Sequence, residues 1–270
     1  MNEKGCFMDN TFKSKRISAI STIIKDIDLN KPTPAKPAME FQFVVADNLF
    51  HRLNAFRLGY AEYLKKGYID ENQYQVLMNN FDLSDDTLTI VAYHGNKEVG
   101  TLTVNTQKVL PFQEIFSCDI VKDKNFKGAE LTRLAIDEDY RNQKDILLGM
   151  FNLAFIHAKF IKNCSHLAIE VNPRHVKFYQ RFLGFEPVAE NANCPRVRGA
   201  PAVLLLGDLE LPFVYPDNYP FLAVGGEREY LINQLKNIKL LSINEIKVLA
   251  RMYRTINQLS SQESGQYASV

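Results

Sequence analysis

The sequence predicts an α+β fold in which a central mixed, mostly antiparallel sheet is flanked by helices. A hairpin is indicated by two β-rich runs, 87–94 and 98–106, on either side of a Gly-Asn turn at 95–96. Two further apolar runs, 129–137 and 166–171, are separated by an apolar segment of helical length. Strands therefore outnumber helices, and the two kinds of element alternate along the chain.

Local signals assign the remaining elements in chain order. Residues 41–46 form an expected strand, and 49–65 an expected helix with its aromatic residues on one side. The run ILLGMFNLAFIHA places a helix from about Asp145 to Lys162. Another helix begins at Asn172-Pro173, because asparagine caps helix N-termini and proline suits the first helical position. Two strands complete the order, at 185–188 and 201–209.

Composition shifts divide the chain into three parts. Three prolines in residues 31–38 mark a linker, so residues 1–39 are an N-terminal arm and linker, 40–210 the main domain and 211–270 a C-terminal helical extension. The arm carries isoleucines at helical spacing after three basic residues. It is interpreted as a docked helix or a frayed arm, and contact with a membrane surface or a partner is the alternative.

The C-terminal extension contains a helix start of its own. Ser242 and Glu245 have the spacing of a capping box, and an apolar stripe follows them. The stripe consists of Ile246, Leu249, Tyr253 and Ile256. Packing onto the main domain is the first interpretation, and a lid or a dimer surface is the second.

The composition is that of a cytoplasmic globular protein. The formal net charge is +1, which gives no overall argument for nucleic acid or an anionic membrane. The four cysteines form no CxxC pair, so neither a disulfide framework nor a metal site is expected. A signal peptide and a spanning segment of ~18 apolar residues are also absent from the sequence pattern.

The order of elements and one motif resemble the GCN5-related N-acyltransferases. The motif is NPRHVKFYQRFLGFEPV at 172–188, which is similar to the family's Asn, aromatic-Tyr and Gly-Phe signature, with one residue of difference in spacing between Tyr179 and Gly184. The resemblance implies that family's fold. It also implies that Tyr179 protonates the departing thiolate, with packing beside Phe178 and Phe182 as the alternative role.

A second set of motifs resembles a narrower group within that superfamily. GAELTRLAID at 128–137 is similar to the Glu-x-x-Arg strand of acyl-homoserine-lactone synthases. Together with RLNAFRLGYAEYLKKGYID, NPRHVKFY and RGAPAVLLLGDL it resembles the N-acyl amino acid synthases, known from long-chain N-acyl tyrosine synthases, over about residues 41–210. The implied reaction moves a long-chain acyl group from acyl carrier protein to the α-amino group of an amino acid.

The stretch YRNQKDILL at 140–148 bears on the acyl donor. Members that use coenzyme A carry Arg/Gln-x-x-Gly-x-Gly here, because bare backbone N–H groups must approach a diphosphate. This chain has Lys144 and Ile146 at the glycine positions. We therefore expect a looser basic rim for the phosphopantetheine of acyl carrier protein, with solvated surface charges as the alternative. Its candidate residues are Arg141, Lys144, Arg174, Lys177 and Arg181.

Candidate catalytic groups follow from the same motifs. Glu130 matches the family glutamate and is the first candidate base, with a paired strand-edge carboxylate as the alternative. His175 in the first turn of a capped helix competes for that role, because the helix dipole favours neutral imidazole. The backbone N–H groups from Leu134 to Ile136 are expected to hold the oxyanion.

The acceptor amino acid needs a cation for its carboxylate, and arginine is the usual choice. The candidates are Arg57, Arg133, Arg196 and Arg198. Arg133 lies three positions after Glu130, so in an ideal strand it faces the other side of the sheet unless a bulge intervenes. The sequence leaves open whether Arg133 organises the fold or binds a carboxylate.

Three other functions stay open at this stage. An acyl-homoserine-lactone synthase would use S-adenosylmethionine, but the tryptophans typical of those proteins are missing. An acyl-coenzyme-A-dependent N-acyltransferase is the second. A degenerate acyltransferase fold that binds acyl carrier protein or lipid is the non-enzymatic alternative. In the favoured interpretation no bound cofactor is expected, because phosphopantetheine arrives on acyl carrier protein.

Overall fold

The computed structural model describes residues 41–239 and 241–266, and the predicted arm, residues 1–39, lies outside them. Its sheet strands are β1 (Gln42–Val45), β2 (Thr87–His94), β3 (Lys97–Asn105), β4 (Gly128–Ile136), β5 (His166–Val171), β6 (Glu186–Pro187), β7 (Ala192–Cys194) and β8 (Ala200–Asp208). The α-helices are α2 (Leu49–Lys65), α3 (Lys144–Ile156), α4 (Val176–Leu183), α5 (Leu211–Val214), α6 (Gly225–Lys236) and α7 (Ile243–Gln266). None of these helices is both long and apolar enough to cross a membrane.

Short single turns connect these elements. The 3-10 turns are η1 (Asn80–Leu83), η2 (Pro111–Glu114), η3 (Asp119–Lys122), η4 (Glu138–Tyr140), η6 (Pro173–His175), η7 (Pro195–Val197) and η8 (Pro216–Asn218). A π-turn, η5 (His157–Ile161), continues α3 to nearly the predicted end of that helix. The predicted strand 185–188 is only two residues long, and β7 has no counterpart among the predicted elements.

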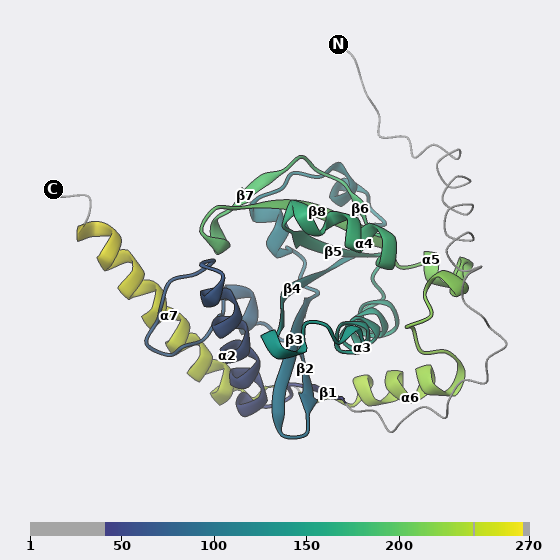
Figure 1. Cartoon of the computed structure of the whole chain (residues 1–270), viewed down its shortest axis with the longest axis horizontal. Coiled ribbons are helices and arrows are strands. Elements are labelled where there is room, and N and C mark those ends of the chain that lie inside the picture. The colour runs from purple at the N-terminus through teal and green to yellow at the C-terminus, as the bar shows by residue number, and fades with distance from the viewer. Residues whose placement is uncertain (1–40, 240, 267–270) are drawn as a thin grey trace, which may run out of the picture. The chain divides into compact units, whose positions relative to one another are not determined.

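The strands form one sheet in the order β1-β2-β3-β4-β5-β8-β6, with β7 paired to β8 (Figure 1). Only β4 and β5 run parallel among these pairs, so the mixed, mostly antiparallel sheet predicted from the sequence is confirmed. The β4–β5 ladder ends at Leu131 and Ile169, whereas β4 stays paired to β3 as far as Ile136. The two central strands therefore separate beyond Leu131.

A bulge in β4 lies where this separation begins. Thr103 pairs with Thr132 and Thr101 with Ala135, so Arg133 and the next residue stand opposite a single residue of β3. Arg133 adopts a left-handed φ of 50° there. The bulge turns Arg133 to the same side of the sheet as Thr132. Arg133 therefore does not face the side that an ideal strand would give it.

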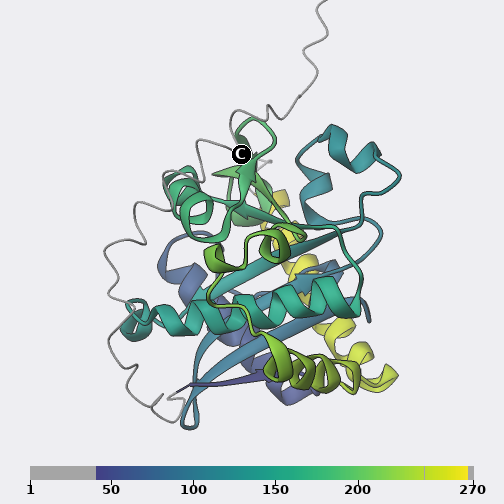
Figure 2. The same ribbon diagram turned by 90° about the vertical axis from the view of Figure 1, so that its right-hand side faces the viewer.

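Helices cover both faces of the sheet (Figures 1 and 2). On the α3 face, alternate strand residues such as Ile90 and Leu102 pack with the buried side chains of α3. On the α2 face, Phe56 and Val91 form a second cluster to which α7 contributes Leu249, which is fully buried. This packing of α7 agrees with the first interpretation of its apolar stripe.

The start of α7 is tied to the start of α2. The Ser242 Oγ accepts a hydrogen bond from the Glu245 backbone N–H, and the Glu245 carboxylate accepts one from Ser242 N, so the predicted capping box is confirmed. The other carboxylate oxygen of Glu245 accepts from Leu49 N at 2.9 Å. Hydrogen bonds from Ser242 and Leu49 lower the pKa of Glu245 to about 2.

Glycine is required where α4 ends. Gly184 closes the helix with φ +68°, and its N–H donates to the Tyr179 carbonyl. A Cβ at this position would lie 2.5 Å from the Tyr219 hydroxyl oxygen. The Gly-Phe motif thus serves both the helix end and the contact with the C-terminal segment.

Replacing Gly184 by Ala should destabilise the protein through strain and overlap together. Gly67 is the matched control, because it follows α2 with φ +67° and has no atom within 4 Å of a built Cβ. We expect Gly67→Ala to cost about 1 kcal/mol of unfolding free energy from left-handed strain, and Gly184→Ala at least about 1 kcal/mol more. Urea unfolding of the two variants measures this difference, and equal losses would show that the Tyr219 contact is unimportant.

Candidate active site

A buried ion cluster lies under α2 on the bulge of β4. Arg133 makes a two-point ion pair with Asp82 of η1, donates to the Thr103 hydroxyl at 2.9 Å and stacks over the Phe56 ring at 4.8 Å. Both charged side chains are nearly inaccessible to solvent. The guanidinium is thus fully engaged inside the protein, which supports the fold-organising role for Arg133 over the carboxylate-binding one.

A second arginine adds positive charge to this cluster. Arg52 of α2 is buried, and burial lowers its pKa to about 10, opposed by Asp82 and assisted by Arg133. Its Nη2 lies 3.4 Å from the Thr87 carbonyl, and its Nε and Nη1 have no hydrogen-bond partner among the described residues. One carboxylate therefore compensates two buried guanidinium groups.

Glu130 lies on the same face but toward the loop after β3. It is wholly buried, and its Oε2 accepts a hydrogen bond from Phe112 N at 2.7 Å. Burial, and then the charge of Glu170, raise the pKa of Glu130 well above its usual value. Among the described residues Glu130 makes no ion pair and its Oε1 has no hydrogen-bond partner, so it differs from the paired strand-edge carboxylate that was the alternative. Its hydrogen bond to Phe112 N holds η2 on the sheet.

The separating ends of β4 and β5 bring two tyrosines and an ion pair together. Burial raises the pKa of Tyr63 on α2 to about 12, with Cys194 and Glu170 adding to the rise and Arg133 opposing it. Burial, and then the Tyr63 hydroxyl, also raise the pKa of Tyr179 on α4. Both phenols therefore keep their protons at neutral pH, and a protonated phenol can act as an acid.

Arg196 is held by protein carboxylates at this opening. Its guanidinium contacts Glu170 at 2.5 Å and Glu114 at 2.7 Å, and it also donates to the Pro111 carbonyl at 3.1 Å. These contacts join β5 to η2. Arg196 consequently has little donor capacity left for the carboxylate of a substrate.

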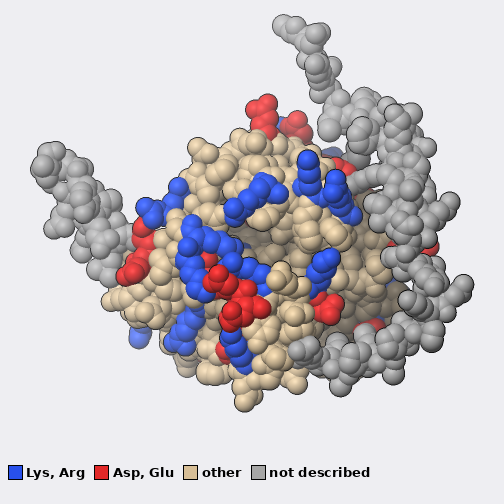
Figure 3. Space-filling model, in the orientation of Figure 1, with Lys and Arg blue, Asp and Glu red and all other residues tan. Residues whose placement is uncertain are grey.

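Basic residues gather at the mouth of this opening, and we call Lys66, Arg141, Lys144 and Arg174 the basic rim. Burial lowers the pKa of Lys66, and the neighbouring charges of Arg141 and Arg174 lower it further. The Arg174 Nη2 donates to the Tyr68 hydroxyl at 3.3 Å, and Lys144 lies 5.7 Å from the Phe182 ring centroid. Figure 3 shows Lys and Arg side chains gathered over the region where α2, α3 and α4 meet, with acidic side chains between them.

Arg141 also has a structural partner. Its Nη2 lies 2.6 Å from Oε2 of Glu62, a nearly inaccessible carboxylate that accepts from Lys65 as well. Burial alone would raise the pKa of Glu62, but the hydrogen bonds from Lys65 and Arg141 outweigh it and lower that pKa. Arg141 thus fixes the loop after β4 to α2 while its exposed part belongs to the basic rim.

His175 lies beside the basic rim. Its Nε2 accepts a hydrogen bond from the Arg174 Nε at 3.0 Å, so the basic nitrogen is already engaged. Burial, followed by the charges of Arg174 and Lys66, lowers the pKa of His175. The direction agrees with the neutral imidazole expected from the sequence, although the causes are burial and neighbouring cations.

The other sequence candidates lie farther out or contribute backbone. Arg57 is exposed on α2, and Arg198 is exposed in a left-handed turn and pairs with Asp70 at 3.3 Å. Lys177 and Arg181 are exposed on α4 and make no ion pair with any described residue. Leu134 and Ile136 pack partly on the α3 face, in the part of β4 that has no β5 partner.

Several residues of this site escaped the sequence analysis. They are Glu62, Tyr63, Lys66, Asp82 and Glu170. Glu170 carried a usable signal, because a carboxylate near the end of an apolar strand, two residues before a helix cap, is unusual in a core. Asp82 carried none, since its role depends on Arg133, 51 residues away.

A known protein family also matches this chain. The family model described as "N-acyl amino acid synthase FeeM" matches residues 54–208, more than half of the chain. The chain belongs to the FeeM N-acyl amino acid synthase family. The family and the fold together make it an amide-forming acyltransferase.

The solved structure of FeeM shows the same fold. FeeM, an N-acyl amino acid synthase from uncultured soil microbes, is 19% identical with a TM-score of 0.53, over 66% of this chain and 93% of that one. BjaI, a coenzyme-A-dependent acyl-homoserine lactone synthase, is 12% identical with a TM-score of 0.49, over 79% and 98%. No curated protein sequence gives a significant match. The fold predicted for this synthase is therefore confirmed.

Removing Asp82 should destabilise the enzyme strongly. Asp82→Ala leaves Arg133 buried and unpaired beside Arg52, so we expect a loss of about 3–5 kcal/mol of unfolding free energy. Asp70→Ala, which breaks the exposed pair with Arg198, should cost less than about 1 kcal/mol. Denaturant unfolding compares the two variants, and adding Arg133→Met to Asp82→Ala should recover part of the loss.

Glu130→Gln should stabilise the enzyme increasingly as pH rises. A carboxyl whose pKa is higher in the folded than in the unfolded state binds its proton more tightly when folded, so stability falls as pH rises above the usual value of 4.5. The glutamine cannot ionise and escapes this loss. Urea unfolding at pH 4.5 and pH 8 tests the trend, with the exposed Glu190→Gln as control; a pH-independent difference would contradict it.

Proposed function

We propose that this synthase transfers a long-chain acyl group from acyl carrier protein to the α-amino group of an amino acid. The observation that carries the donor assignment is the start of α3. Ile146, at a position where coenzyme-A enzymes need glycine, is fully buried, and its Cγ2 fits against Gly100 so closely that a Cβ there would lie 2.8 Å away. The Ile146 N–H donates to the Gln143 carbonyl at 3.3 Å, so this backbone group is already engaged and does not serve a diphosphate.

The basic rim supports the same donor. A phosphopantetheine arm carries one phosphodiester, and the carrier protein behind it is acidic, so dispersed cations suffice for both. Lys66 follows α2, Arg141 follows η4, Lys144 begins α3 and Arg174 lies in η6, and the charges of Arg141 and Arg174 act on Lys66. Charge complementarity of this kind guides association and orientation.

The reaction needs few groups from the protein. The acceptor amine attacks the thioester carbonyl, the new C–N bond forms, and the C–S bond breaks after a tetrahedral intermediate. Backbone N–H groups on the unpaired side of β4 around Leu134–Ile136 stabilise the oxyanion in this proposal. Tyr179 is the phenol at this opening that can donate its proton to the leaving thiolate; burial raises its pKa, so the transfer depends on the thiolate lying within hydrogen-bond distance of the phenol.

The base and the carboxylate site are also part of the proposal. Of the two bases expected from the sequence, Glu130 is wholly buried against Phe112 N, and the basic nitrogen of His175 accepts from Arg174. Glu170, at the end of β5 where the strands separate, is therefore the base in this proposal. Among the predicted arginines, Arg57 and Arg198 are exposed, and Arg198 is the one assigned to the acceptor carboxylate in this proposal. Its partner Asp70 is 80% exposed and can exchange with a substrate, whereas Arg133 and Arg196 are bound to buried groups.

A donor competition tests the proposal directly. The full chain is incubated with palmitoyl-acyl carrier protein or palmitoyl-coenzyme A and a mixture of amino acids, and products are identified by mass spectrometry. We expect N-palmitoyl amino acids at a lower Michaelis constant with the carrier-protein thioester. Equal or better use of the coenzyme A thioester would overturn the donor assignment while leaving the acyltransferase activity in place.

Charge reversal on the basic rim should weaken use of the carrier protein. We expect Lys144→Glu and Arg174→Glu each to raise the Michaelis constant for palmitoyl-acyl carrier protein about fivefold or more, the equivalent of about 1 kcal/mol. The exposed Lys247→Glu on α7 is the matched control and should change little. Arg141 is unsuitable for reversal, because a glutamate there would face the buried Glu62 and disturb the fold.

A further inference from the structure

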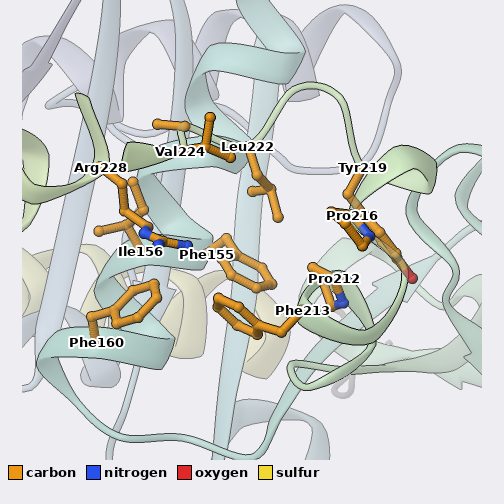
Figure 4. Close-up of a pocket in the computed structure, with 11 residues that line it drawn as sticks. Phe155, Ile156, Phe160, Pro212, Phe213, Pro216, Tyr219, Leu222, Val224 and Arg228 are labelled. Atoms are coloured by element: carbon orange, nitrogen blue, oxygen red, sulfur yellow. The ribbon is translucent and has the colours of Figure 1, made fainter. Parts of the chain in front are cut away.

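A cavity of about 120 Å³ lies outside the candidate active site, between the end of α3 and the segment from α5 to α6. Figure 4 shows its walls, which are mainly aromatic and aliphatic. Phe155 and Phe160 come from α3 and the π-turn, and Phe213 and Leu222 come from the C-terminal segment. The part of the wall after residue 208 is not included in the family match, so the family gives it no role.

Arg228 is the cation among the described residues that line this apolar space, and Lys159, which is not part of the lining, lies 5.9 Å from the Phe213 ring centroid. The Arg228 guanidinium lies 5.5 Å from the Phe160 ring centroid and 5.7 Å from that of Phe213, and its side chain points between them in Figure 4. Aromatic faces attract a guanidinium and hold it in place. Arg228 makes no ion pair with any carboxylate in the described part of the chain, and the nearby Glu210 is bound to Lys159.

The cavity reaches the protein surface. Two of its lining residues are strongly exposed for apolar side chains, Phe213 at 41% and Val224 at 65%. An exposed aromatic rim beside a fixed cation provides an entrance for an amphipathic molecule. A ligand can therefore enter from solvent without passing Tyr179.

We propose that this cavity binds a carboxylate joined to an apolar tail of about six carbons. The volume is comparable with an engineered apolar cavity of roughly 150 Å³ that binds benzene, which sets the size of the tail. The unpaired guanidinium sets the charge of the head group, because a bidentate carboxylate satisfies its donors. The methyl end of a donor's acyl chain would instead leave Arg228 facing hydrocarbon, so the charge favours a free carboxylate as occupant.

Binding of matched six-carbon probes tests this site on the full chain. Ligand-observed NMR titrations compare hexanoate with hexanol and hexylamine, and N-hexanoylglycine distinguishes an acylated amino acid from a free fatty acid as the source of the carboxylate. We expect hexanoate to bind about fivefold or more tightly than hexanol, with hexylamine the weakest. Equal binding of hexanoate and hexanol would overturn the proposal.

The variant Arg228→Met keeps a long side chain but removes the charge. It should abolish the preference for hexanoate while hexanol still binds, and retained hexanol binding shows that the cavity is intact. Arg251→Met, on the exposed side of α7, is the matched control and should keep the full preference. A preference that survives in Arg228→Met would assign the carboxylate to another site and overturn the inference.

Discussion

The ion pair between Arg133 and Asp82 is the interaction on which the arrangement of the site depends. The bulge in β4 turns Arg133 toward α2, and Asp82 meets it from η1, whose capping box with Asn79 fixes the carboxylate. The Phe56 ring lies over the guanidinium. Three segments distant in sequence are thus clamped at the point where β4 leaves β5. Unpaired charge in such a place is costly, so the clamp is satisfied only when all three segments are in position.

The start of α3 contributes both to the core and to the surface. Ile146 closes the core against the sheet, and the loop before it supplies Arg141 and Lys144 to the surface. In a glycine-rich loop the backbone itself would contact the ligand, whereas in the proposed donor site side chains do so. Long side chains reach farther and tolerate variable positions, which suits a bulky protein donor better than a nucleotide held by fixed N–H groups.

Much of the fold could be predicted from the sequence, because its signals are local. The hairpin at 95–96, the cap at Asn172 and the capping box at Ser242 each depend on residues a few positions apart. The site was harder to predict, since its partners meet only in the folded chain. A bulge in β4 places Arg133 on the opposite face of the sheet from the one expected, and no residue type in the strand predicts that bulge. The sequence pattern also does not indicate that Arg141 pairs with the buried Glu62. Glu130 was placed correctly on the central strand, but its hydrogen bond to the Phe112 backbone depends on a loop without a clear pattern.

The contact between Tyr219 and Gly184 makes the C-terminal segment part of the same folding unit as the sheet. The family match stops at residue 208, yet Tyr219 seals the end of α4, and Ala223, Leu235 and Leu249 are buried with the strands and helices before them. A chain shortened to residue 210 would open apolar surface on both sides of the sheet. The segment that matches the family model is therefore shorter than the segment that folds as a unit. The residues after 208 must be present before the hydrophobic core is complete.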